Sequence, residues 1–236
     1  MTAERWAQTV RHQVGLGRLL PLGGSRDGAW ISEEAAEAAL RRTAAKMPGV
    51  RLDVLRIALA DPEDVQDPVV PPPPSALPPG PLRVTVEFAA TAAAPLPATA
   101  ALVRATLSAA ARERIGLEVA EVDLRVTALL DEEPDPVPVR QPDPPRAGEA
   151  GADDEGRAAE AALSVPGVAH LTTGLGRAVQ LEERTTDNAL PHRHARVELA
   201  VAPAHRPSDV AQAVRTAVQN TLPDRPTVTV LVTATG

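Results

Sequence analysis

The sequence predicts an α+β protein made of two repeated small lobes, each a short mixed sheet with helices packed on it, joined by a proline-rich acidic linker. The first observation is a repeat, because AAEAALRRTAAKMPGV at 35–50 resembles AAEAALSVPGV at 158–168. A loop, a strand, a helix and a last strand are expected after each copy. Such a long spacing does not suit a solenoid and indicates two copies of one domain-sized unit.

The second observation is the distribution of charge and proline. Residues 131–155 hold nine acidic and two basic residues, which accounts for the net charge of −7 of the whole chain. This segment is rich in proline and has no hydrophobic periodicity, a composition typical of disorder. We therefore expect a first lobe at 19–130, a disordered acidic linker at 131–155 and a second lobe at 156–236.

Residues 1–18 are expected to form an N-terminal helix outside the lobes. Trp6, Val10 and Val14 recur every four residues, so that they would line one face of the helix. Basic residues lie around this face, which favours contact between residues 4–18 and an anionic membrane or a partner. Alternatively, the helix caps the first lobe with its tryptophan.

The first lobe begins with short extended segments at 18–24 and 28–31. Ser32 is a typical helix N-cap, and the acids that follow it favour a helix that runs to about Lys46. The remaining elements are strands at 51–60, 81–90 and 122–130, and a helix at 97–114. The apolar alternation in the first of these strands changes phase across Leu55, which predicts a bulge.

The insertion at 68–81 contains eight prolines. Such a run favours polyproline II or disorder over a sheet. We interpret the insertion as a spacer between two strands, and a PxxP ligand for another domain is the alternative.

The second lobe follows the same plan as the first. Its expected elements are a helix at 158–164, an extended region at 169–183, a polar loop at 184–194, a strand at 195–202, a helix at 208–222 and a strand at 227–234. The last strand is apolar on both faces at Val230-Leu231-Val232, which predicts burial on both sides or an interface. Both valines are therefore candidate interaction residues, together with Trp6, Val10 and Val14.

Composition excludes several kinds of function. The chain has no cysteine, so disulfides, thiolate metal sites and cysteine nucleophiles are excluded. The N-terminus lacks an apolar signal-peptide core and no stretch approaches the ~18 apolar residues of a membrane span, so a cytoplasmic location is expected. Neither lobe has the basic surplus that binding to nucleic acid requires. We expect no nucleic-acid partner.

The most suggestive polar cluster is His192-Arg193-His194 in the polar loop. Two histidines at i and i+2 on an extended segment can share a metal ion, and Asp187 or His205 could add a ligand. The charge of Arg193 opposes this, so the histidines are weak metal candidates and a solvated loop is the stronger interpretation.

Two other motifs point weakly to chemistry. Gly-Leu-Gly-Arg occurs at 15–18 and at 174–177, and such turns can present backbone N–H groups to phosphate. Neither copy continues into a complete phosphate-binding motif, and we interpret both as plain turns. No carboxylate pair has a recognisable catalytic context. We expect no catalytic residues, no cofactor and no enzyme activity.

The repeated unit resembles the alkaline shock protein family, the Gls-type general stress proteins. The resemblance rests on Met47-Pro48-Gly49-Val50 and Val165-Pro166-Gly167-Val168 after the first helices, and on the strands and helices that follow each turn. It covers most of 18–130 and 156–236 as two degenerate copies in a chain of actinobacterial type. This resemblance implies a small, non-enzymatic cytoplasmic protein linked to cell-envelope stress, in a family in which some members associate with the membrane.

The sequence therefore favours a scaffold or interaction protein that contacts a protein partner or a second copy of itself. Aspartate at Val126 or Val230 is then expected to disrupt lobe packing or assembly. The alternative is a small-molecule or metal-binding protein that uses the 184–194 loop.

Overall fold

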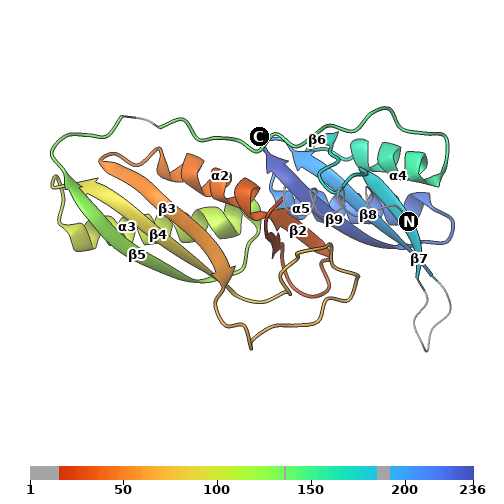
Figure 1. The fold of residues 1–236 in the computed structure, drawn as a ribbon, viewed down its shortest axis with the longest axis horizontal. Helices are drawn as coiled ribbons and strands as arrows, with labels where there is room; N and C mark the ends of the chain where they lie inside the picture. Colours follow the sequence, from red (N-terminus) through yellow and green to blue (C-terminus); the bar gives the residue numbers. More distant parts are fainter. Residues whose placement is uncertain (1–15, 136, 185–191) are drawn as a thin grey trace, which may run out of the picture.

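The computed structural model describes residues 16–135, 137–184 and 192–236. Within them the chain forms an α+β fold with nine strands in two mixed sheets, four α-helices and a π-helical turn (Figure 1). The strands are β1 (Leu19–Pro21), β2 (Ala29–Ser32), β3 (Val50–Leu59), β4 (Leu82–Thr91), β5 (Val119–Leu130), β6 (Val168–Leu171), β7 (Val179–Arg184), β8 (His192–Val201) and β9 (Thr227–Thr235). The helices are α2 (Glu33–Ala44), α3 (Leu96–Ala109), the π-helical η1 (Ala110–Ile115), α4 (Asp154–Leu163) and α5 (Pro207–Thr221). The predicted α+β class is confirmed.

The three-stranded sheet has the order β3-β4-β5. β3 pairs antiparallel with β4, and β5 pairs parallel with β4 after the crossover through α3 and η1. The bulge predicted in β3 is present as a register shift between Leu52 and Leu55, slightly before the expected position. One long face of this sheet is apolar and packs on α3, as the alternation of Val84, Val86 and Phe88 predicts.

The six-stranded sheet has the order β1-β2-β9-β8-β6, and β7 also pairs with β8. β6 and β7 are antiparallel to β8, and β9 is parallel to β8 after the crossover through α5. An antiparallel pair followed by a parallel strand across a helix is therefore present in both sheets. The second sheet differs because its last strand, β9, also pairs on its other side with β2.

The placement of β1 and β2 differs from the expected first lobe at 19–130. These strands belong to the six-stranded sheet, where Ala29, Trp30 and Ile31 pair in parallel with Val230, Leu231 and Val232. The backbone of β2 covers an edge of β9 that would otherwise expose its N–H and C=O groups, and the side chains of Ala29 and Ile31 are buried in the core. The sequence boundary between the lobes is therefore crossed by the N-terminal strands.

Helix α2 connects the two sheets. Its N-cap is Ser32, whose side chain accepts a hydrogen bond from the N–H of Ala35 at 3.2 Å, as predicted. The same hydroxyl donates to the carbonyl of Thr233 in β9, and Arg42 donates to the hydroxyl of Thr235. α2 also packs on β3, and one continuous apolar core includes side chains from both sheets.

The proline-rich insertion at 68–81 is packed on the protein rather than free. Val70 is buried with Leu19, Trp30 and Leu231 on the face of the six-stranded sheet away from α5. The indole N–H of Trp30 donates to the carbonyl of Leu77 at 3.0 Å. The insertion thus runs from the end of β3 across the six-stranded sheet and back to the start of β4. This path, rather than a role as a free spacer, accounts for its length.

The acidic segment at 131–155 is extended where the structure describes it. It is expected to be disordered, but Arg146 forms an isolated antiparallel bridge with Thr172, and the N–H of Ala147 donates to the carbonyl of Leu171 at 2.9 Å. These contacts add an extended stretch beside β6. The acidic segment is ordered here because its backbone bonds to the edge of the six-stranded sheet, a contact that cannot be predicted from its composition.

The two Pro-Gly-Val turns have the same backbone role. Gly49 and Gly167 each follow a helix and have φ values of 67° and 97°, a left-handed conformation that favours glycine. A Cβ at Gly167 would lie 2.7 Å from Val210 and from His205. Both turns therefore redirect the chain from a helix into a strand.

Candidate functional site

The predicted interaction residues do not form a surface in the described part of the chain. Trp6, Val10 and Val14 lie outside the described residues. Val230 and Val232 are fully buried within β9, between β2 and β8. The interpretation of this strand as buried on both sides is correct, and the two valines are core residues that no partner can reach without unfolding.

The two candidate metal ligands lie on the same face of β8. His192 is exposed, whereas His194 is 5% exposed and its Nδ1 is 2.8 Å from the hydroxyl of Thr227. Burial, followed by the nearby charges of Arg184, lowers the pKa of His194 to about 4, so its imidazole is neutral at pH 7. Among the described residues, no three ligand-type side chains come together to hold a metal ion.

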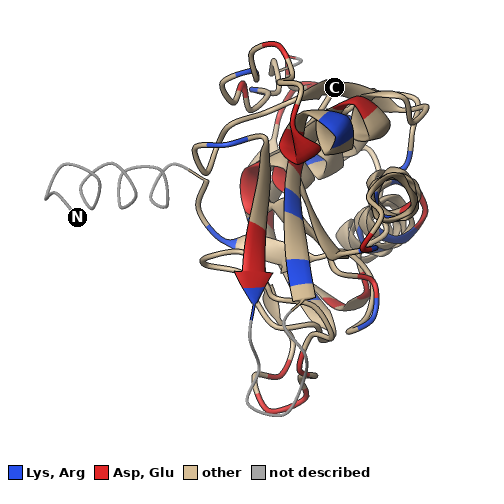
Figure 2. Ribbon diagram, turned by 90° about the vertical axis from the view of Figure 1, so that its right-hand side faces the viewer, with Lys and Arg blue, Asp and Glu red and all other residues tan. Residues whose placement is uncertain are grey.

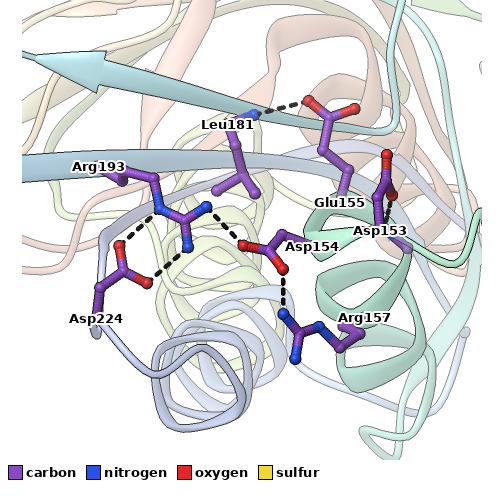
Figure 3. Close-up of polar contacts among 8 residues, drawn as sticks. Asp153, Asp154, Glu155, Arg157, Leu181, Arg193 and Asp224 are labelled. Atoms are coloured by element: carbon purple, nitrogen blue, oxygen red, sulfur yellow. Dashed lines mark hydrogen bonds and ion pairs between the residues drawn. The ribbon is translucent and has the colours of Figure 1, made fainter.

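Arg193 points to the opposite face of β8. Its guanidinium donates two hydrogen bonds to Asp224 at 2.6 and 2.7 Å and one to Asp154 at 2.7 Å (Figure 3). These two acids raise the pKa of Arg193 above its usual value. Asp154 is in the first turn of α4, behind the N-cap Asp153. Arg193 therefore holds a helix start against the loop before β9, which is a structural role.

The second Gly-Leu-Gly-Arg turn, at 174–177, binds a carboxylate of the chain itself. The N–H of Leu175 donates to Glu198 Oε2 at 2.9 Å. Glu198 is completely buried, its Oε1 lies 3.4 Å from Arg196 without a hydrogen bond, and desolvation raises its pKa to about 7. The turn does present N–H groups to an anion, but this anion is internal, so no free phosphate site results.

The charged strand β7 lies beside the first half of β8. Glu182 and Glu183 pair with His194 and Arg193, and Figure 2 shows the acidic end of β7 beside the basic residues of β8. A small pocket of about 220 Å³ lies here under the proline run that begins at Pro71. Its walls consist of four prolines, two arginines, Gln180, Glu182 and His194, and they show no arrangement specific for one ligand.

β5 is an exposed edge strand of the fold. Among the residues that the structure describes, this 12-residue strand pairs with β4 alone and forms one edge of the three-stranded sheet (Figure 1). Its apolar side carries Val126 at 38% exposure and Leu129 at 61%, and Leu102 of α3 is 58% exposed. We call the backbone edge of β5 with these three side chains the β5 edge. Long exposed edges with apolar side chains are sites where a further strand can add.

The other side of β5 is charged. Arg83 of β4 forms ion pairs with Glu121 at 2.7 Å and with Asp123 at 3.5 Å, and Glu87 pairs with Arg125. The side chains of Asp123 and Arg125 remain 61% and 71% exposed. Strongly solvated pairs of this kind contribute little to stability, so both groups are available to other charges.

An arginine on the crossover helix reaches the edge of the last strand in both sheets. Arg104 Nε donates to the carbonyl of Val122 in β5 at 3.1 Å, and Arg215 Nε donates to the carbonyl of Val228 in β9 at 3.0 Å. In the six-stranded sheet, β2 begins to pair two residues further along β9, where the N–H of Val230 donates to Gly28. The corresponding position of β5 is Leu124, and no described strand pairs with it there.

The sequence contains a signal that distinguishes the two last strands. β9 carries no charged residue on either face, which is typical of an interior strand, whereas Asp123 and Arg125 alternate with apolar residues in β5. We predicted both strands, but the edge position of β5 depends on where β2 pairs, which the sequence pattern does not reveal.

Comparison of the chain with protein-family models, with curated proteins and with solved structures gives no match. In the parts of the chain that the structure describes, every helix is too short or too polar to cross a bilayer.

Proposed function

We propose that this chain is a non-enzymatic cytoplasmic interaction protein, a scaffold that acts through the β5 edge. The single observation that carries the proposal is a 12-residue edge strand that, within the described ranges, is paired on one side and exposes Val126 and Leu129. An added strand would satisfy the free backbone groups of β5 and cover these side chains.

We further propose that the chain contains two copies of one unit. The proposal is supported by the shared order of pairings, by the left-handed glycine after α2 and α4, and by the equivalent contacts of Arg104 and Arg215. It is also supported by a register shift at the same place in both last strands, beside Thr127 and beside Thr233. In this interpretation, β5 and β9 are equivalent strands, and β9 is the one whose edge is covered by another strand in the described part of the chain.

A link to cell-envelope stress is proposed from the resemblance to alkaline shock proteins. The Pro-Gly-Val turns and the strands that carry this resemblance are the elements that support the duplication. Residues 4–18 remain the proposed contact with an anionic membrane or with an anchoring partner. This part of the proposal is tested by vesicle flotation of the chain with and without residues 1–18.

The test of the β5 edge is site-specific cross-linking in the native cells. A photoreactive amino acid replaces Arg125 in one variant and Gln219, an exposed residue of α5, in the control. We expect protein adducts with the probe at 125 and none with the probe at 219. Equal adduct formation at both positions, or none at 125, would refute an interaction through β5.

A further inference from the structure

We propose that the partner of β5 is β5 of a second copy of this chain, paired antiparallel about a two-fold axis at Leu124. The inference rests on the proposed function and names the occupant of the same edge. In the dimer, the three-stranded sheets of the two copies would join into one sheet of six strands. The argument comes from the backbone, the apolar face and the charged face of β5.

The backbone of β5 offers its free groups at the correct residues. The carbonyl of Val122 accepts from Arg104, as the carbonyl of Val228 accepts from Arg215 in β9. In β9 the N–H of Val230, two residues further, donates to Gly28 on the side where β2 pairs, so we take the equivalent groups of β5 to point to the open edge. Alternate residues of a strand direct their N–H and C=O groups to the same side, so Leu124 and Val126 also point outward. Leu124 can therefore exchange two hydrogen bonds with Leu124 of the second copy, and Val122 can pair with Val126.

The apolar residues of β5 oppose one another in this register. A two-fold axis perpendicular to the sheet keeps the same faces together, so the helix side of one copy continues into the helix side of the other. Val126, which is 38% exposed, then lies opposite Val122, and the two Leu124 side chains meet at the axis. Cross-strand pairs of this kind are the unit of stabilisation between strands.

The charged face of β5 is complementary to itself. With Leu124 at the axis, Asp123 of each copy lies opposite Arg125 of the other, which gives two symmetric pairs of opposite charge. The exposed fractions of these side chains, 61% and 71%, leave both accessible to a partner. The ion pairs within the sheet, from Arg83 and Glu87, continue across the axis as a row of alternating charge.

Neighbouring registers fail on the same criteria. An axis at Val122 places Asp123 opposite Glu121, and an axis at Asp123 brings two aspartates together. An axis at Val126 leaves the charged residues without opposite partners and includes the register shift beside Thr127. The regular stretch between the register shifts of β5 is centred close to Leu124, so the proposed register is favoured by geometry and charge together.

Sedimentation velocity of the full chain tests the register through charge reversal. Arg125→Asp places aspartates opposite each other at both contacts, and Asp123→Arg places arginines opposite each other. We expect each variant to dimerise about tenfold more weakly than the wild type, which corresponds to ~1.4 kcal/mol shared by two contacts. An equimolar mixture of the two variants restores both opposite-charge pairs, so it should recover association close to that of the wild type.

Arg56→Asp is the matched control. It makes the same change in charge on β3, the other edge strand of this sheet, and should leave association unchanged. Circular dichroism confirms that all variants are folded. The recovery in the mixture cannot come from a folding defect, because each chain in the mixture keeps its own defect.

The outcomes separate the inference from the proposed function. A wild-type chain that remains monomeric, or a dimer that ignores both charge reversals, overturns the β5 pairing. Cross-linking at position 125 then decides the rest. Adducts with a different protein leave the interaction function standing without the β5 pairing, and the absence of adducts overturns both.

Discussion

Replacement of the buried acid Glu198 by glutamine should stabilise the protein at alkaline pH. Glu198 is fully buried, and desolvation raises its pKa from 4.5 to about 7 against the opposing effects of the Leu175 N–H and Arg196. The unfolded chain ionises this group above its ordinary pKa, whereas the folded chain keeps the proton up to about pH 7. The carboxyl therefore favours the unfolded state increasingly as the pH rises through this window.

The magnitude follows from the two pKa values. A difference of one pKa unit corresponds to ~1.36 kcal/mol. The raised pKa of Glu198 therefore lowers the free energy of unfolding by about 3 kcal/mol at pH 8 and by about 1 kcal/mol at pH 5. Glutamine has nearly the same shape and its side-chain oxygen can still accept from Leu175. The free energy of unfolding of Glu198→Gln should therefore exceed that of the wild type by about 2 kcal/mol more at pH 8 than at pH 5.

Urea unfolding followed by circular dichroism at both pH values measures this difference. The comparison uses variant minus wild type at each pH, because other groups, above all His194, also change the stability of the wild type with pH. Glu160→Gln is a control in which an exposed carboxyl on α4 is replaced by its amide. A variant that is less stable than the wild type at pH 8, or a difference independent of pH, would refute the reasoning.

Three further predictions concern single side chains. Between pH 7.5 and pH 5 the wild type should lose about 2 kcal/mol of unfolding free energy, because the unfolded chain protonates His194 and the folded chain does not. His194→Gln should remove this loss, measured by urea unfolding. Arg193→Ala should cost about 1–2 kcal/mol, whereas Arg177→Ala, at a more exposed ion pair, should cost less than ~0.5 kcal/mol; equal losses would contradict the structural role of Arg193. Gly167→Ala should lower the melting temperature strongly because its φ is 97°, and Gly148→Ala, with open space around it, should not.

The elements of the fold could be predicted from local signals. Ser32 and the acids after it specify the start of α2, and the alternation of Val84, Val86 and Phe88 specifies a half-buried strand. The positions of Gly49 and Gly167 mark the ends of two helices. These signals are local because capping, alternation and left-handed glycines act over only a few residues.

The assembly of the elements could not be predicted in the same way. The pairing of Trp30 with Leu231 joins residues from opposite ends of the chain, and the packing of Val70 on both depends on that pairing. The proline insertion has a composition that is typical of a spacer, yet its carbonyl groups accept hydrogen bonds from Trp30 and, at Pro71, from Thr229. Long-range contacts of this kind leave no periodic pattern in the sequence.

The candidate site illustrates the same limit. His192 and His194 attract attention because histidine suggests metal chemistry, but the electrostatically unusual residue on that face is Glu198, whose local sequence ARVELAV is simply that of a strand. Its burial results from the Gly174–Arg177 turn folding over it. The Gly-Leu-Gly-Arg turn resembles a phosphate loop and so indicates that an anion could bind there. The structure shows that its N–H groups bind the carboxylate of Glu198 from the same chain.

The two last strands show why one half of the molecule is closed and the other open. β9 and β5 occupy the same place in their sheets, and both carry a neighbouring arginine that binds a carbonyl at the start of the edge. β9 is covered by β2, and neither of its faces carries a charged residue. β5 keeps charges of both signs, Asp123 and Arg125, on its open face. Exposed charges protect an edge from indiscriminate pairing. The order of Asp123 and Arg125 around Leu124 is complementary to itself in an antiparallel pair, so these charges permit pairing with an identical strand.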